Sequence, residues 1–266
     1  MELLKEKIEE LLATYTGRWG MMIMDQSTQE RFELNPTMIF PAASMIKVPI
    51  MYEIMCQVAD NLIHLDDILI VESNQRVGGA GILQELRPNI TMTVKELVTL
   101  MIILSDNTAT NLLINLIGMD AVNTRMSKLG LKSTVLRRHM MDFEAAQSGK
   151  ENETCATDLI LLFDIIEKKL HLPQEYGELM LDILKRQQVQ DKLPFYLPET
   201  TILAHKTGTL DKVEHDGGIL FLPQGSYLIC ILTADLKENY QGLQLVASLG
   251  KIIYDQMILR RTHHVS

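Results

Sequence analysis

A serine and a lysine stand three residues apart in the stretch FPAASMIKVPIMYE, residues 40–53. Residues at i and i+3 share one face of a helix, so Ser44 and Lys47 are expected to point together at the start of a helix. A serine hydroxyl becomes a strong nucleophile only when a base removes its proton. Lysine can be that base if apolar neighbours and the positive end of the helix lower its pKa. The pair therefore indicates covalent catalysis by Ser44, with Lys47 as the proton acceptor.

The same pair has a simpler explanation. A Ser-x-x-Lys match is expected about once by chance in a chain of this length. A solvated lysine beside a helix-capping serine would explain it without any chemistry. Pro49 follows closely, and because proline lacks the N–H donor we also expect an irregular first turn. The pair needs support from other motifs.

Two further motifs supply that support. Residues 105–107 read Ser-Asp-Asn between two predicted helices, and residues 206–208 read Lys-Thr-Gly on a predicted strand. Taken singly, the first is a good helix start and the second a plausible strand exit. Finding all three motifs by chance, in this order and context, has a probability far below about one per cent.

With these motifs the chain resembles the class A β-lactamase-like serine hydrolases, a group that includes penicillin-binding proteins. The order of the motifs and their placement on helix, lobe and sheet agree with that family from the first strand to the last helix. The resemblance implies a small-molecule substrate, namely a β-lactam, a small peptide amide or an ester. It implies no cofactor and no metal.

The resemblance also assigns catalytic roles. Ser44 would attack a carbonyl carbon and become acylated, and Lys47 would accept its proton, directly or through water. Ser105 would pass a proton to the departing nitrogen. Lys206 would add positive charge across the cleft and help Ser105 to donate.

Four more residues are implied in substrate binding. Asn107 would hold Lys47 or the substrate amide, and Gly208 would leave room for substrate along the strand edge. Thr207 and Thr209 would bind a substrate carboxylate, and the backbone N–H groups of Ser44 and Thr209 would form the oxyanion hole. The arginine that often reads the carboxylate in this family has no counterpart that we can place, although Lys212 is near.

The base that releases the acyl group in this family is missing from the expected loop. Residues 136–159, LRRHMMDFEAAQSGKENETCATDL, lack the pattern Arg-x-Glu-x-x-x-Asn. Counting back from ENET puts Arg137 at the arginine, His139 at the glutamate and Phe143 at the asparagine. Asp142 and Glu144 are the nearest carboxylates. We expect Glu144 to face solvent and His139 to have a structural role, although any of these three side chains could supply the base.

A missing base predicts an acyl-enzyme that persists, with weak or atypical deacylation. Alternatives within the same fold are a D-alanyl peptidase and an esterase. A catalytically silent penicillin-binding or sensor protein is a further alternative, but the two serines and two lysines of the motifs are all present.

The elements that must position these groups change character twice along the chain. Strands are predicted at 17–25 and 31–36, a helical period runs over 44–187, and three more strands follow at 201–210, 215–223 and 226–235. Thr93 and Glu96 form a predicted capping box, and Gly118 and Gly130 are predicted to end helices.

This pattern predicts an α+β fold. A five-stranded antiparallel sheet, flanked by the N- and C-terminal helices, is formed by the discontinuous residues 1–43 and 188–266. An all-helical second lobe is formed by residues 44–187, with the catalytic cleft between the lobes.

Composition narrows the function further. The 266 residues carry a net charge of −9, which argues against nucleic acid as a partner and is explained by solubility. The three cysteines, Cys56, Cys155 and Cys230, show no metal spacing and fit a reducing compartment.

The N-terminus is amphipathic and no segment predicts a membrane span. We expect a cytoplasmic protein as written, or an extracytoplasmic one if a leader is missing. The oligomeric state is not indicated.

Overall fold

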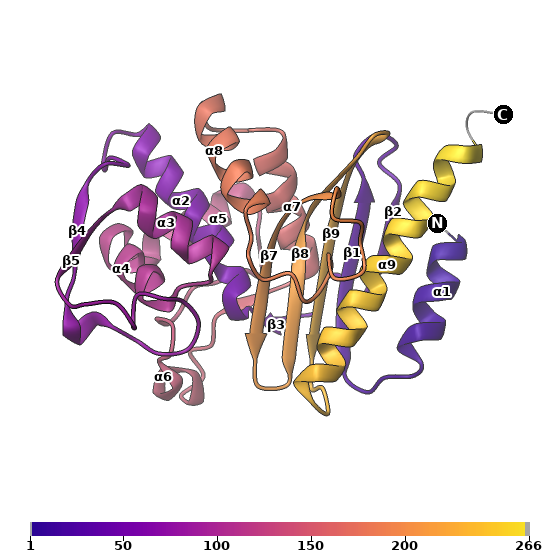
Figure 1. Ribbon diagram of the computed structural model, residues 1–266, viewed down its shortest axis with the longest axis horizontal. Coiled ribbons are helices and arrows are strands. Elements are labelled where there is room, and N and C mark those ends of the chain that lie inside the picture. Colours follow the sequence, from indigo (N-terminus) through magenta and orange to yellow (C-terminus); the bar gives the residue numbers. More distant parts are fainter. Residues whose placement is uncertain (1, 264–266) are drawn as a thin grey trace.

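A five-stranded antiparallel sheet separates two layers of helices in this computed structural model, which describes residues 2–263 (Figure 1). The strand order is β2-β1-β9-β8-β7, so two strands from the start of the chain pair with three from its end. The predicted five-stranded sheet is therefore confirmed. The strands are β1 (Arg18–Asp25), β2 (Arg31–Leu34), β7 (Ile202–Leu210), β8 (Val213–Leu222) and β9 (Gly225–Ala234).

The sheet is buried on both faces. Successive side chains of a strand point to opposite faces, and in β1 Met21 and Ile23 pack in the core beneath the terminal helices. Met22 and Met24 pack in the other core, which the sheet shares with the helical lobe. This explains why β1 reads as a continuous apolar run. Figure 1 shows the terminal helices, α1 (Glu2–Leu12) and α9 (Asn239–His263), packed together over one face of the sheet.

Helix α9 spans 25 residues and carries both apolar and charged side chains. Leu245, Leu249 and Ile253 lie in the core beneath it. Lys251 and Asp255 form an exposed ion pair one turn apart. Within residues 2–263, no helix combines the length and apolarity needed to cross a bilayer.

Local signals set the helix ends of the second lobe. Thr93 Oγ1 accepts from the N–H of Glu96 at 3.2 Å, and Glu96 Oε2 accepts from the N–H of Thr93 at 2.7 Å, so the predicted capping box is confirmed. Gly118 and Gly130 follow the last residues of α4 and α5 with φ of 81° and 89°, as predicted. The helices are α2 (Lys47–Ala59), α3 (Val94–Ile103), α4 (Asn107–Ile117), α5 (Met119–Leu129), α6 (Phe143–Gln147), α7 (Ala156–Glu167) and α8 (Gln174–Lys185).

The second lobe differs from the prediction in one respect, because residues 44–187 are not all helical. Strand β4 (Ile68–Val71) pairs antiparallel with β5 (Ile90–Thr93), and the short β6 (Glu153–Thr154) pairs with β3 (Phe40–Pro41). The β4 sequence, ILIV, is mostly β-branched, which favours a strand. Its four residues were too short to stand out against the helical period around them.

The three cysteines are free and buried. Cys56 lies on α2 and Cys230 on β9, and both belong to the core between the sheet and the helical lobe. Burial raises the pKa of each of these two thiols. They pack as small apolar side chains, as expected from their apolar surroundings in the sequence.

Candidate active site

Ser44 lies in a 3₁₀ turn (Ala43–Ile46), and α2 begins only at Lys47. The sequence predicted that the serine would start the α-helix itself. Ala43 precedes it with φ of 46°, a left-handed conformation that is uncommon for a residue other than glycine. Pro49 is the third residue of α2, where its missing N–H donor is tolerated, and the irregular turn lies directly before the helix at residues 43–46. Such strained turns cluster at functional sites.

Lys47 is fully buried and donates three hydrogen bonds. Its Nζ lies 2.7 Å from Ser105 O, 3.1 Å from Ser105 Oγ and 2.8 Å from Asn107 Oδ1. Burial lowers the pKa of Lys47 to about 7, although the carboxylate of Asp106 opposes the shift. A large share of this amine is therefore neutral near pH 7.

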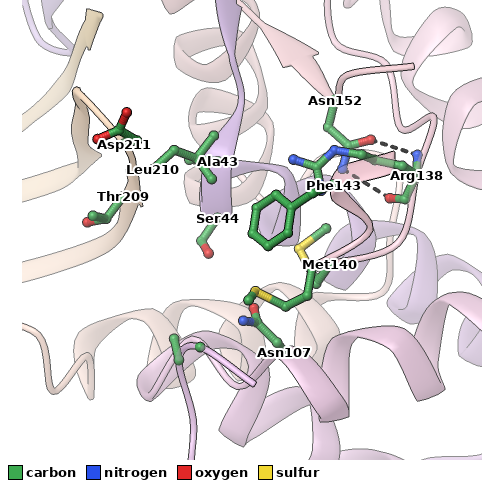
Figure 2. A pocket seen from close by; sticks show the side chains of 13 residues that line it. Ala43, Ser44, Asn107, Arg138, Met140, Phe143, Asn152, Thr209, Leu210 and Asp211 are labelled. Atoms are coloured by element: carbon green, nitrogen blue, oxygen red, sulfur yellow. Dashed lines mark hydrogen bonds between the residues drawn. The ribbon is translucent and has the colours of Figure 1, made fainter. Parts of the chain in front are cut away.

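The expected partnership of Lys47 with Ser44 takes a different form. The hydrogen bonds of Lys47 go to Ser105 and Asn107, and the contact with Asn107 is one of the two roles expected for that residue. The Ser44 hydroxyl makes no hydrogen bond to any residue in the part of the chain that the structure describes. It points into the cavity that Ser44 and Asn107 both line (Figure 2). Ser44 and Asn107 thus share one cavity, with Lys47 bonded beneath it to Asn107.

Ser105 lies between α3 and α4 with φ of 55°. Its Oγ accepts from Lys47 Nζ at 3.1 Å and from Lys206 Nζ at 3.0 Å. A hydroxyl oxygen has two lone pairs and one proton. Because both lone pairs are occupied, the proton of Ser105 is free to be donated to a substrate.

Asp106, the middle residue of the Ser-Asp-Asn motif, has the structural role of a helix start. Its Oδ1 accepts from the N–H of Ala109 at 2.8 Å and caps α4. Its Oδ2 accepts from the N–H groups of Ile82 and Leu83 at 2.7 and 2.9 Å. Asp106 therefore fixes the loop, while its two neighbours in the motif contact Lys47.

Lys206 reaches the same hydroxyl from β7. Its amine is fully buried and also donates to Thr207 O at 2.7 Å. Burial holds the pKa of Lys206 well below the usual range of a lysine, and the positive charges of Lys47 and Lys192 lower it further. Buried ammonium groups that lie close together repel one another, which disfavours charging both amines at once.

Gly208 allows β7 to pack directly against the serine turn. A Cβ at this position would lie 3.1 Å from Ala43 Cβ and 3.3 Å from Ser44 N. These contacts are tighter than ordinary packing, so a side chain here would push the strand from the turn. Thr207 beside it is buried within β7 and is not among the residues that line the cavity.

The hydroxyl of Thr209, which the resemblance assigns to a substrate carboxylate, is hydrogen-bonded within the protein. The hydroxyl donates to Glu214 Oε2 at 2.8 Å and accepts from Lys192 Nζ at 2.9 Å. Lys192 and Glu214 are both buried and form an ion pair at 2.7 Å. The proton of Thr209 is therefore already used, and the charge of Lys192 is neutralised by its partner.

Lys192 is the functional-site residue that the sequence reasoning missed. It also donates to Gly208 O at 2.9 Å and so braces the end of β7. Nothing in the motif QDKLPF distinguishes this lysine from a surface one. Lys212, the basic residue that the sequence places near the expected carboxylate site, is exposed in the β7–β8 turn with φ of 57° and does not line the cavity.

A cavity of about 320 Å³ lies at Ser44, between the end of β7 and the loop that follows α5. Figure 2 shows Thr209 and Asp211 on one side of Ser44 and Arg138 and Asn152 on the other. Part of the wall is apolar and comes from the loop. This part consists of Met140, Met141 and Phe143.

Met140, one residue beyond the position that counting suggested, is among the loop residues that line the cavity, and His139 is not. Both backbone groups of Met140 are held by Asn111, whose Oδ1 accepts from Met140 N at 2.8 Å and whose Nδ2 donates to Met140 O at 3.1 Å. His139 instead contacts Asn115, with 2.8 Å between Nε2 and Oδ1. Met140 and Met141 lie in a turn and both line the cavity, so counting along the chain does not give the side chain that faces Ser44.

The acidic candidates of the loop lie elsewhere. Asp142 caps α6 by accepting from the N–H of Ala145 at 3.0 Å, and Glu144 is exposed on that helix, as expected. Arg137 pairs with Glu153 at 2.6 Å and is also outside the cavity lining. The cavity-lining residues from this loop thus include no carboxylate.

Known proteins resemble this chain in sequence and in fold. A family model described as the Beta-lactamase enzyme family matches residues 3–257. A beta-lactamase of Bacteroides uniformis is 25% identical over 97% of this chain and 92% of its own. The structure of a beta-lactamase from Sphaerobacter thermophilus has a TM-score of 0.86 at 29% identity, covering 94% of each chain. A mutant of PBP-A, in an acyl-enzyme complex with penicillin G, has a TM-score of 0.88 at 26% identity, covering 97% of each chain.

Proposed function

Because the chain belongs to the beta-lactamase enzyme family, we propose that it is an active-site serine hydrolase, acylated at Ser44 by β-lactams or related amides and esters. One observation carries the proposal. The hydroxyl of Ser105 accepts hydrogen bonds from two buried amines, Lys47 and Lys206, and Lys47 is also bonded to Asn107 in the wall of the cavity that contains Ser44.

In the proposed acylation, Ser44 Oγ forms a bond to the substrate carbonyl carbon while its proton passes to the neutral amine of Lys47. The C–N bond of the substrate then breaks, and the departing nitrogen takes the proton of Ser105. Lys47 returns its proton to Ser105 along their 3.1 Å contact. The net result moves the proton of Ser44 to the leaving nitrogen. Lys206 holds Ser105 in position and stabilises negative charge on it during the transfer.

The carbonyl oxygen becomes negative during attack and needs donors. We assign this role to the backbone N–H groups of Ser44 and Thr209, on the turn and on β7. Gly208 supports this assignment because it lets the two segments approach closely. One such donor typically contributes about 3 kcal/mol to lowering the barrier.

Release of the acyl group is proposed to be slow. Hydrolysis of an acyl-enzyme requires a base that activates water near the ester. In this chain Met140, Met141 and Phe143 stand where the loop lines the cavity, and none of them can accept a proton. The apolar wall therefore favours an acyl-enzyme that persists.

Slow release supports a second candidate, a penicillin-binding protein or D-alanyl peptidase of the same fold. The similarity to beta-lactamases supports turnover of β-lactams, whereas the similarity to the PBP-A acyl-enzyme supports covalent capture of penicillin. An esterase would use the same serine. The alternatives differ in the rate of deacylation and in the leaving group.

The test is to incubate the protein with penicillin G and follow its intact mass and the free penicilloate over time. We expect one covalent adduct on the wild-type protein, no adduct on Ser44→Ala, and release over minutes or longer. Parallel reactions with a D-alanyl-D-alanine peptide and a short acyl ester identify the preferred leaving group. Absence of any adduct, with all three substrate classes, would remove the proposal.

A further inference from the structure

Asp211 is a charged residue of the cavity that contains Ser44, and its carboxylate has no partner. It lies just past the end of β7, is exposed, and forms no hydrogen bond or ion pair with any residue in the range 2–263. The other charged residue of the lining, Arg138, is buried and pairs with Glu151 at 2.7 Å. The charge that this cavity offers to a ligand is therefore negative.

The neighbouring Thr209 strengthens this polarity. Its proton is donated to Glu214, so its hydroxyl presents only a lone pair to the cavity. The ammonium of Lys192, which would otherwise make this end positive, is neutralised by Glu214 at 2.7 Å. Lys212 follows Asp211 in the chain, but it is exposed in the turn and outside the cavity lining.

The opposite wall is apolar. Met140 and Met141 line it, together with Phe143, whose side chain is 51% exposed. A half-exposed aromatic ring beside a catalytic serine gains contact area when a ligand covers it. In Figure 2 the ring of Phe143 lies close to Ser44, and Asp211 lies across Ser44 from it.

The chemistry of the proposed reaction decides which part of the substrate fills this cavity. Ser105 and Lys206 handle the departing nitrogen, and neither belongs to the cavity lining. The cavity is left for the acyl portion that stays attached to Ser44. Its volume of about 320 Å³ has room for an acyl side chain of ten or so heavy atoms.

From these contacts we propose that Asp211 is a specificity-determining residue that selects acyl groups carrying an ammonium on an apolar stem. The stem packs against Phe143 and the methionines, and the ammonium faces Asp211 and the lone pair of Thr209. This inference rests on the proposed acylation of Ser44 and names the substrate class that the site prefers.

The experiment uses three penicillins that differ only at the α-carbon of a phenylacetyl side chain, which bears hydrogen, an ammonium or a carboxylate. The second-order rate of adduct formation is measured by intact mass for the wild-type protein, Asp211→Asn and Asp211→Lys. The neutral compound is the internal reference for each variant, so general damage to the site cancels in the ratio.

We expect the ammonium-to-neutral ratio to fall about three- to tenfold in Asp211→Asn, and the carboxylate compound to become preferred in Asp211→Lys. Glu144→Gln is the matched control, because it removes an exposed carboxylate outside the cavity and should leave the ratios unchanged. Identical ratios in wild type and Asp211→Asn would overturn the inference while leaving acylation intact. Adducts with none of the three penicillins would overturn the proposed function as well.

Discussion

Ser105 Oγ and Lys206 Nζ lie 3.0 Å apart, although 101 residues separate them in the chain. One group comes from the loop between α3 and α4 and the other from β7 of the sheet. The contact joins the helical layer to the sheet, and Asn107, two residues after Ser105, lines the cavity of Ser44. Lys47 completes the arrangement by donating to the same hydroxyl at 3.1 Å.

The pKa of Lys47 predicts how acylation depends on pH. Only the neutral amine can accept the proton of Ser44, and burial sets its pKa at about 7. The rate of adduct formation should rise about tenfold per pH unit below 7 and level off above it. Intact-mass kinetics between pH 5 and 9 measure this profile.

Lys47→Arg is the matched variant for that profile, because arginine keeps the positive charge and cannot lose its proton. Its rate should fall by about 10²- to 10⁴-fold and lose the inflection near pH 7. A wild-type rate that is flat across this range would show that Lys47 is not the base.

Met140→Glu should accelerate deacylation, which we propose to be slow in the wild-type protein. The side chain of Met140 lines the cavity of Ser44, so a carboxylate there could activate water beside the acyl ester. We expect the release of hydrolysed penicillin to accelerate at least about tenfold. His139→Glu is the control, because His139 contacts Asn115 and lies outside the cavity lining. Acceleration by the His139 variant and not by the Met140 variant would contradict the geometry of this loop.

Gly208→Ala should impair acylation more than it impairs folding. The added methyl would lie 3.1 Å from Ala43 Cβ and 3.3 Å from Ser44 N, and would displace the serine turn from β7. We expect adduct formation to slow at least about tenfold, with a loss of about 1–2 kcal/mol in the free energy of unfolding. Denaturant melts and intact-mass kinetics separate the two effects.

Gly78→Ala serves as the matched substitution for Gly208→Ala, because the methyl would meet only the flexible end of Gln84 at 3.6 Å. It should leave the acylation rate within about twofold of wild type. Equal effects from the two substitutions would mean that the approach of β7 to Ser44 is not what Gly208 provides.

Because His215 is buried, we expect the free energy of unfolding to decrease in acid. His215 lies on β8, donating from Nε2 to Pro41 O at 2.8 Å and accepting at Nδ1 from Thr233 N at 3.1 Å, so the imidazole is neutral. Burial lowers its pKa to about 4, below the ordinary value of 6.5. The unfolded chain therefore binds the proton first. The contribution of neutral His215 to the free energy of unfolding is fully present above pH 6.5, and about 3 kcal/mol of it is lost as the pH drops to 4.

His215→Gln keeps one donor and one acceptor but cannot titrate. The free energy of unfolding of the variant, measured by urea denaturation between pH 4 and 7, should decline less steeply than that of wild type. The difference between the two slopes isolates His215 from other titrating groups. Parallel slopes would mean that this imidazole does not titrate between the folded and unfolded states.

Part of this molecule could be read directly from its sequence, because the relevant signals are local. The capping box of Thr93 and Glu96 and the glycines 118 and 130 fixed helix ends within one turn of the chain. The five strands of the sheet followed from apolar runs with turn residues between them. The short β4 was not predicted, because its four residues are too few to stand out from the helical period around them.

The side chains that form the site could also be predicted from the sequence. Three motifs named two serines, two lysines and an asparagine, and the structure places Lys47, Ser105, Asn107 and Lys206 within one hydrogen-bond network. These side-chain types are able to transfer protons and to attack a carbonyl carbon.

Only the tertiary structure decided which of these groups touch. The sequence paired Lys47 with Ser44 and gave Asn107 as a further possible partner. Packing of α2 against the loop before α4 directs the Lys47 amine to Asn107 and also to Ser105. The same holds for Met140 facing the cavity in place of His139, and for the buried pair of Lys192 and Glu214 behind β7. The sequence determined which residue types and secondary elements exist, since those depend on neighbours along the chain. Hydrogen-bond partners and pKa values depend on burial and on groups tens of residues away, so only the packed fold could determine them.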